Sequence, residues 1–267
     1  MNIKKNSFRN LFPATSPQYG VWNGLVDNIV AEILAGSGYD WILVDGEHAP
    51  FDLQSIQSQI QALGQFGIPV LVRPAKGDSV VIKQLMDIGV QTLVVPMVET
   101  AEQAEYVFKS MRYPPQGIRG VGTAMARASQ WNRVNNYFQN ANDEMCLIVQ
   151  VESVKGIANL DAILAVEGIE GVFIGPADLA ASMGYLGKGD HPEVIKVIEV
   201  AIQKIKAANK INGIMVIGNK SLTESYAALG SNMIAVAIDT LLLAKSAMEV
   251  ANSFIGENID NQSNTKY

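Results

Sequence analysis

Residues 69–73 are Pro-Val-Leu-Val-Arg and residues 92–96 are Thr-Leu-Val-Val-Pro, so both segments are short and continuously apolar at their centres. Neither segment alternates apolar with polar residues, as a strand with one face in water would. Continuous apolarity is typical of strands that are buried on both faces, as in a parallel sheet covered by helices. These two segments therefore predict strands of an α/β fold.

Similar apolar segments recur along the chain, and helical patterns separate them. Val81, Leu85 and Ile88, for example, share one face of a predicted helix. Gly89 follows at the point where this helix should end. Repeated βα units predict a (β/α)8 TIM barrel, although a doubly wound sheet would have the same periodicity. The predicted strands cover residues 19–24, 41–44, 69–72, 92–96, 146–151, 171–174, 213–217 and 233–238.

The length and composition favour one domain with a large core. The chain has 267 residues, of which 48% are hydrophobic and 17% are charged. Barrels of this type routinely fill about 250 residues as a single domain. We therefore predict a polar N-terminal segment at residues 1–18, a single catalytic barrel domain at residues 19–255 and a polar tail at residues 256–267.

The charge balance and the lone cysteine argue against several classes of function. The formal net charge is −6, which disfavours nucleic acid, because phosphate backbones attract basic surfaces. The first residues lack the apolar run of a signal peptide, and no stretch approaches the roughly 20 apolar residues of a membrane span. Cys146 is the single cysteine, so no intrachain disulfide forms. We expect a cytoplasmic protein without nucleic acid or membrane partners.

One long segment interrupts the βα rhythm. Residues 111–143 contain no clear strand but include Arg112, Arg119, Arg127 and Arg133. Long loops in compact domains are usually functional or disordered. A solvated loop is one interpretation, while several arginines in an acidic chain favour anion binding or a subunit contact.

Polar side chains follow four of the predicted strands. In a β/α barrel the catalytic residues lie at the carboxyl ends of the strands, where the βα loops form the active face. Charged groups are costly to bury there unless they are paired or bind a metal. The set comprises Asp45, Glu47 and His48 after the second strand, Arg73 after the third, Gln150 and Glu152 after the fifth, and Asp178 after the sixth.

Two of these acids suggest a metal site. Glu152 and Asp178 come from neighbouring strands, so their carboxylates can converge on one ion. Mg²⁺ or Mn²⁺ suits two carboxylates with positions left for water and substrate, and Co²⁺ or Zn²⁺ are alternatives. A 2-oxo acid chelates such an ion, which stabilises the enolate formed when a C3 proton leaves. Alternatively, both acids are loop caps or ion-pair partners.

The other polar residues suggest roles around such an enolate. Arg73 offers a fixed positive fork for a carboxylate or enolate oxygen, and His48 can act as a base near neutral pH. The turn at residues 175–178 should leave free N–H groups at Ala177 and Asp178 for a substrate carboxylate. No lysine ends a predicted strand, which favours metal over Schiff-base chemistry.

Three long sequence blocks are specific enough to indicate a family. They are Trp-Ile-Leu-Val-Asp-Gly-Glu-His-Ala-Pro at 41–50, Arg-Tyr-Pro-Pro-Gln-Gly-Ile-Arg-Gly-Val-Gly at 112–122 and Gly-Val-Phe-Ile-Gly-Pro-Ala-Asp-Leu at 171–179. In these blocks the chain resembles the HpcH/HpaI family of class II pyruvate aldolases, and the resemblance extends over residues 19–254. It implies a TIM barrel of the phosphoenolpyruvate/pyruvate-binding type.

The resemblance also implies a role for each polar residue at the strand ends. Glu152 and Asp178 would bind the divalent metal. His48 would transfer the proton, and Arg73 would stabilise the enolate. The residues expected to contact the 2-oxo acid are Trp22, Arg73, Gln150, Gly175, Ala177 and Asp178.

A further catalytic aspartate is implied as a partner of the histidine. Asp87 resembles the family's aspartate that raises the basicity of this histidine. Asp87 ends a predicted helix that precedes a strand, which places it at the barrel face opposite His48. A neighbouring subunit could supply it, consistent with the family's trimer-based homohexamers. Asp45 is the competing catalytic partner within the chain.

Enzymes of the family cleave 4-hydroxy-2-oxo acids to pyruvate and an aldehyde, and they catalyse the reverse addition. The resemblance therefore implies a metal-dependent carbon–carbon lyase acting on 4-hydroxy-2-oxoheptanedioate or a 2-keto-3-deoxy sugar acid, in aromatic or sugar acid catabolism. Succinic semialdehyde, lactaldehyde and tartronate semialdehyde are all compatible aldehydes.

One alternative function is a CoA-ester lyase of the citrate lyase beta type, which should have extra basic loops. Another is a non-catalytic 2-oxo acid binding protein, which would need no base such as His48.

Overall fold

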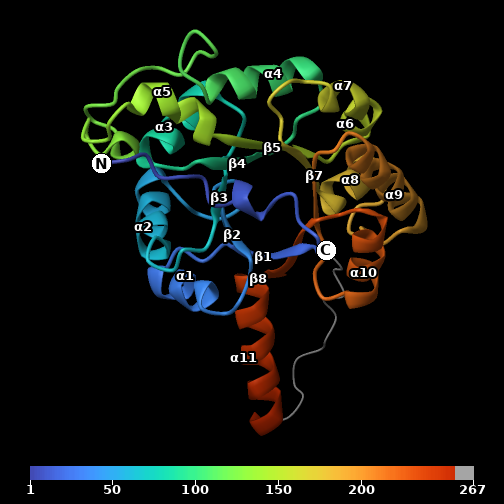
Figure 1. The fold of residues 1–267 in the computed structure, drawn as a ribbon. Helices are drawn as coiled ribbons and strands as arrows, with labels where there is room; N and C mark the ends of the chain where they lie inside the picture. The colour runs from blue at the N-terminus through green and yellow to red at the C-terminus, as the bar shows by residue number, and fades with distance from the viewer. Residues whose placement is uncertain (256–267) are drawn as a thin grey trace.

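The computed structural model describes residues 1–255 and contains a closed barrel of eight parallel strands (Figure 1). The strands are ordered as in the sequence, and β8 pairs with β1. The closed barrel confirms the predicted TIM-barrel fold, because a doubly wound sheet would have two free edges. The strands are β1 (Gln18–Asn23), β2 (Trp41–Asp45), β3 (Val70–Arg73), β4 (Thr92–Val95), β5 (Cys146–Val151), β6 (Gly171–Ile174), β7 (Ile211–Met215) and β8 (Met233–Ile238).

Helices surround the barrel, and several begin at an acidic or hydroxyl cap. The side chains of Asp27, Asp52, Asp78 and Thr100 each accept hydrogen bonds from N–H groups in the first turn of the next helix. Such a cap stabilises a helix by about 1 kcal/mol. The helices are α1 (Asn28–Ala35), α2 (Leu53–Leu63), α3 (Ser79–Ile88), α4 (Ala101–Ser110), α5 (Tyr137–Ala141), α6 (Val154–Ala158), α7 (Leu160–Leu164), α8 (Pro176–Ser182), α9 (Pro192–Ala207), α10 (Lys220–Leu229) and α11 (Asp239–Ile255), with short 3-10 helices at Arg9–Leu11, Arg127–Ser129 and Asn142–Glu144.

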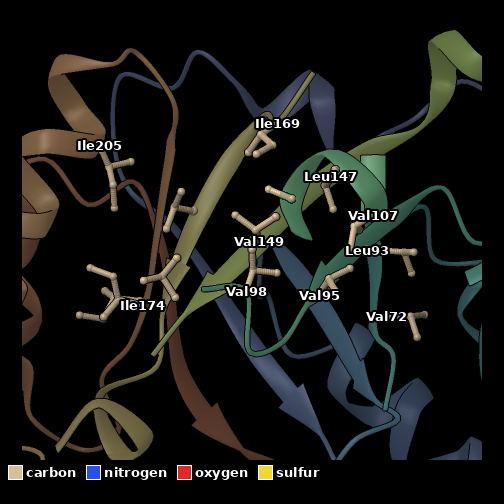
Figure 2. Close-up of a cluster of buried hydrophobic side chains, with 14 of the residues drawn as sticks. Val72, Leu93, Val95, Val98, Val107, Leu147, Val149, Ile169, Ile174 and Ile205 are labelled. Atoms are coloured by element: carbon tan, nitrogen blue, oxygen red, sulfur yellow. The ribbon is translucent and has the colours of Figure 1, made fainter. Parts of the chain in front are cut away.

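Two layers of core explain why the strand segments do not alternate in sequence. Leu93 and Val95 of β4 face the helices, and Figure 2 shows this outer layer of buried side chains. Val94, between them, packs with Trp41 and Phe173 inside the barrel. Both faces of the strand are therefore apolar, as the sequence predicted. The predicted strand at 213–217 lies two residues too late, because the backbone N–H of Ile211 already bonds to Glu170.

The N-terminal segment packs under the barrel, although its polar sequence predicted no strong element. Phe8 is buried in the same interior cluster as Trp41. The Asn6 side chain donates to the Oγ1 of Thr92 over 3.0 Å, and Glu144 accepts the backbone N–H of Asn6 over 2.8 Å. These contacts close the amino end of the barrel and leave the carboxyl end for a site. The predicted tail at 256–267 lies outside the described residues.

The segment at residues 111–143 has no strand, as predicted, and its arginines have partners within the chain. Arg112 lies over the Phe108 ring, and Arg119 pairs with Asp87 over 2.6 Å. Arg127 and Arg133 donate to backbone carbonyl oxygens. Anion binding or a subunit contact by this segment stays a prediction.

Helix α11 projects away from the barrel (Figure 1). Asp239 is its only buried residue, whereas Leu243 is 60% exposed and Phe254 is 87% exposed. Within residues 1–255, none of the helices combines the length and apolar character that a bilayer crossing needs. Helix α1 also presents Ile29 and Ile33 to solvent, at 68% and 63% exposure.

The contact between β1 and β2 yields a test of barrel packing. A Cβ added at Gly20 would lie 2.1 to 2.4 Å from three ring atoms of Trp41, which is fully buried. We expect Gly20→Ala to lower the free energy of unfolding by about 2 kcal/mol, because overpacking a rigid core forces strain. Urea denaturation would measure it, with Gly122→Ala as control, since no atom lies within 4 Å of a Cβ there. Equal midpoints for both variants would contradict this packing.

Candidate active site

A pocket of about 620 Å³ opens at the carboxyl end of the barrel strands. Most of the site residues predicted from the sequence meet there. Glu152 lies beneath the pocket, where its carboxylate accepts a hydrogen bond from the Gln150 side chain. The predicted residues that line the pocket are Trp22, Asp45, His48, Arg73, Gln150, Gly175, Ala177 and Asp178.

Arg73 is held in one orientation by two carboxylates. Its Nε and Nη2 donate to the two oxygens of Asp45 over 2.8 and 2.6 Å. Its Nη1 lies 2.8 Å from Oε2 of Glu47. Because β2 and β3 are paired with Asp45 opposite Arg73, the strand register brings these groups together. The bidentate geometry fixes the plane of the guanidinium at the pocket wall.

Trp22 on β1 supports this ion pair from the barrel interior. Its Nε1 donates to Oδ2 of Asp45 over 3.1 Å, and the Arg73 guanidinium lies 5.0 Å from its ring centroid. Burial alone would raise the pKa of Asp45, but the hydrogen bonds and the charge of Arg73 outweigh it and hold that pKa below its usual value. Asp45 is therefore a permanent anion near neutral pH.

Glu47 belongs to this group, although the sequence indicated no role for it. Oε2 of Glu47 contacts Arg73 and also lies 3.9 Å from Nε2 of His48. Burial raises the pKa of Glu47, and the negative charges of Asp45 and Asp178 add to the effect of burial. The sequence signal that could have indicated a role for Glu47 is its position two residues after Asp45, in the turn that ends β2.

His48 lies at the rim, with a side chain that is 68% exposed. Its backbone N–H is 3.4 Å from Oδ1 of Asp45. Asp45 therefore binds the backbone of this turn, and the carboxylate beside the imidazole is that of Glu47. A base at the mouth of the pocket can reach a proton on a molecule bound inside.

Glu152 is the most strongly perturbed acid of the site. Its side chain is almost completely buried, and Oε1 accepts the backbone N–H of Met97 over 2.9 Å. Burial raises the pKa of Glu152 to about 7; the charges of Asp178 and Glu47 act in the same direction, and the Met97 hydrogen bond opposes them. Oε1 of Gln150 is buried without a partner.

These residues fit a divalent cation. Among residues 1–255 no group of three or more His, Cys, Asp or Glu side chains is arranged to hold a metal. The donor set is instead two carboxylates from neighbouring strands, Glu152 and Asp178, which repel each other. A hard cation would relieve that repulsion and keep positions for water and substrate.

The turn after β6 leaves a helix start uncapped by side chains. Gly175 is the N-cap of α8, Pro176 is the first helical residue, and no side chain accepts the first N–H groups. A Cβ at Gly175 would lie 2.2 Å from Oε2 of Glu152, so the close approach of the two strands requires glycine. Ala177 and Asp178 follow within the first turn.

Asp87 is a predicted site residue that lies away from the pocket and from the residues that contact its lining. It lies at the end of α3, before β4, and Oδ1 accepts a hydrogen bond from Nη2 of the fully buried Arg119. Helix ends that precede a strand lie at the opposite face of a barrel. Any contact between Asp87 and His48 would therefore involve two copies of the chain.

The Asp45–Arg73 pair predicts a pH-dependent stability. We expect Asp45→Asn to lower the free energy of unfolding at pH 7 by about 3 kcal/mol, because it leaves a buried guanidinium under-compensated. Since the folded state lowers the Asp45 pKa, its contribution is present above the unfolded pKa and is lost as pH falls. Urea denaturation of the wild type and of Asp45→Asn, from pH 7 down through the unfolded pKa, would measure the difference in free energy of unfolding. A penalty that grows on acidification below about pH 4 would contradict the assignment.

Comparisons with known proteins identify the family of the chain. A family model described as HpcH/HpaI aldolase/citrate lyase matches residues 18–246. A hydroxypyruvate/pyruvate aldolase of Pseudomonas aeruginosa is 50% identical over 256 residues, which cover 96% of this chain and 95% of that protein. A 4-hydroxy-2-oxo-heptane-1,7-dioate aldolase of Escherichia coli is 50% identical over 250 residues, covering 94% and 95%. The solved structure of an HpcH/HpaI aldolase/citrate lyase family protein from Burkholderia cenocepacia has a TM-score of 0.88 and 34% identity, and covers 93% of this chain and 99% of that one. The chain belongs to the HpcH/HpaI aldolase family.

Proposed function

We propose that this protein is a class II aldolase that reversibly cleaves a 4-hydroxy-2-oxo acid to pyruvate and an aldehyde. The observation that carries the proposal is one pocket lined by Asp178, Arg73 and His48, with Glu152 hydrogen-bonded to Gln150 of the same lining. The names of the relatives at 50% identity support it. They also suggest hydroxypyruvate as a second donor and heptanedioate-type substrates, alongside the 2-keto-3-deoxy acids.

The residues divide the chemistry between them. Glu152 and Asp178 would hold a divalent ion, with Mg²⁺ or Mn²⁺ the best match to oxygen donors. When bound, that ion polarises the ketone and stabilises the enolate. Arg73, whose Nε and Nη2 are held by Asp45, presents a fixed positive charge to the enolate oxygen, and the uncapped turn at Ala177 and Asp178 orients the substrate carboxylate.

His48 would carry the transferred proton in both directions of the reaction. In aldol addition it accepts the C3 proton of pyruvate, and in cleavage it accepts the proton of the C4 hydroxyl group. Its exposed position at the rim supports a role between a 2-oxo acid bound in the pocket and an aldehyde that enters from solvent. A 2-oxo acid sensor would need no such base, which favours the enzyme over a binding protein. In the described residues the pocket lining contains no lysine, and Arg73 is its only arginine, which does not favour a CoA-ester lyase.

We also propose a homo-oligomer, a trimer-based hexamer, in the cytoplasm, with residues 19–255 as the catalytic domain. Two surfaces support contact between copies: the projecting helix α11 and the exposed isoleucines of α1. The position of Asp87 at the opposite barrel face supports a role across a subunit interface, where it would approach His48 of another copy.

The proposed half-reaction can be tested without knowing the aldehyde. We expect pyruvate C3 protons to exchange with D₂O when Mg²⁺ or Mn²⁺ is added, and not in the presence of a chelator. His48→Ala should abolish exchange, and Arg73→Lys should slow it by about 100-fold, because an ammonium cannot keep the bidentate geometry. Proton NMR measures the exchange rate, and circular dichroism confirms that each variant folds. Metal-independent exchange at the wild-type rate would disprove this function.

The proposed assembly can be tested by introducing a negative charge on each exposed apolar face. We expect Leu243→Glu and Ile33→Glu each to lower the mass measured by light scattering, because a charge is costly to bury at an interface. Leu186, which is 81% exposed on a loop, provides the control Leu186→Glu. A wild-type mass in both test variants would exclude these faces as subunit contacts.

A further inference from the structure

We propose that Glu47 is a positioning residue of the reaction, because one oxygen of its carboxylate lies between the enolate-binding Arg73 and the proton-transferring His48. This inference rests on the proposed function. Oε2 of Glu47 is 2.8 Å from Nη1 of Arg73 and 3.9 Å from Nε2 of His48. The two groups that must act on the same pyruvate are thereby tied to one atom.

Asp45 cannot take this position, because its oxygens are already occupied. Oδ1 accepts from Arg73 and from the backbone N–H groups of Glu47 and His48. Oδ2 accepts from Arg73 and from the Trp22 indole. A carboxylate offers about four lone-pair sites. Asp45 therefore anchors the turn, and Glu47 is the acid left to face the imidazole.

The environment of Glu47 suits a fixed carboxylate. Its side chain is 18% exposed, whereas that of His48 is 68% exposed. Its backbone N–H donates to Oδ1 of Asp45 over 3.0 Å, which fixes the direction in which the side chain leaves the turn. When His48 holds a proton, the imidazolium and this partly desolvated carboxylate attract each other. Glu47 thus orients the base.

Glu47 also lines a second cavity, of about 290 Å³, together with Lys76, Met97 and Tyr106. Arg73 lines the main pocket, so the ion pair between Arg73 and Glu47 joins a residue of one lining to a residue of the other. Shortening Glu47 would remove the carboxylate that holds Nη1 of Arg73, and a guanidinium that is held less firmly interacts more weakly with an enolate oxygen.

The kinetic test compares Glu47→Gln and Glu47→Ala in pyruvate C3 exchange with added Mn²⁺. We expect Glu47→Ala to lower kcat by about 10- to 100-fold with little change in KM for pyruvate, as for loss of one hydrogen bond to a charged group. Glu47→Gln keeps an acceptor for Arg73 and should recover part of kcat. Glu170→Gln is the matched control, because Glu170 is 19% exposed and pairs with Arg9 at the other end of the barrel.

A second readout does not depend on activity. The chain has only two histidines, so ¹⁵N-histidine labelling resolves both rings by NMR. We expect Glu47→Gln to shift the Nε2 resonance of His48 and to leave His191, stacked on Tyr185, unchanged.

Unchanged His48 resonances, or wild-type kcat in Glu47→Ala, would overturn the proposal. So would a kcat loss matched by an equal loss of Mn²⁺ affinity, measured by calorimetry. If the wild type itself fails to exchange, the proposed function fails, and the NMR result alone decides whether Glu47 orients His48.

Discussion

The ion pair between Arg73 and Asp45 is the interaction on which the candidate site depends. Both side chains are almost completely buried, and a buried charge persists only when it is paired and hydrogen-bonded. The register of β2 and β3 places the two residues side by side, and Trp22 from β1 fixes the carboxylate from below. The pair presents a rigid guanidinium in the same pocket that Asp178 lines, and Glu152 is hydrogen-bonded to Gln150 of that lining. Charges of both signs are thus fixed before any substrate binds, which is the arrangement that favours a developing enolate.

The sequence predicted most of the fold because burial on both faces leaves a clear pattern. Leu93, Val94 and Val95 are apolar in succession, since they alternate between the helical layer and the barrel interior. Closure of the barrel was harder to predict from the sequence, because an open doubly wound sheet has the same pattern of apolar strands. The role of the N-terminal segment was hidden for a different reason. Phe8 is the one fully buried apolar side chain of this segment, and polar contacts such as those of Asn6 and Arg9 hold much of the rest.

The candidate site was predictable wherever a polar residue directly ends a strand, because the barrel topology then decides where it lies. Arg73 is the last residue of β3 and Asp45 the last residue of β2, and Gln150 lies one residue before the end of β5. Glu47 was not assigned a role, since its direction depends on hydrogen bonds within the turn after β2. The Asp87–Arg119 pair joins residues far apart in sequence. A role for Asp87 across a subunit boundary stays a prediction, and the roles of the individual residues remain proposals.

The central claim is that two carboxylates that follow β5 and β6, those of Glu152 and Asp178, hold a divalent ion at the pocket that Arg73 lines. Electron paramagnetic resonance of Mn²⁺ tests it most directly, because bound and hexaaqua Mn²⁺ have different signals. The account predicts one Mn²⁺ site per chain, with affinity lowered by at least about tenfold in Glu152→Gln and in Asp178→Asn, and a signal that changes when pyruvate is added. Undiminished Mn²⁺ affinity in both folded variants would contradict it.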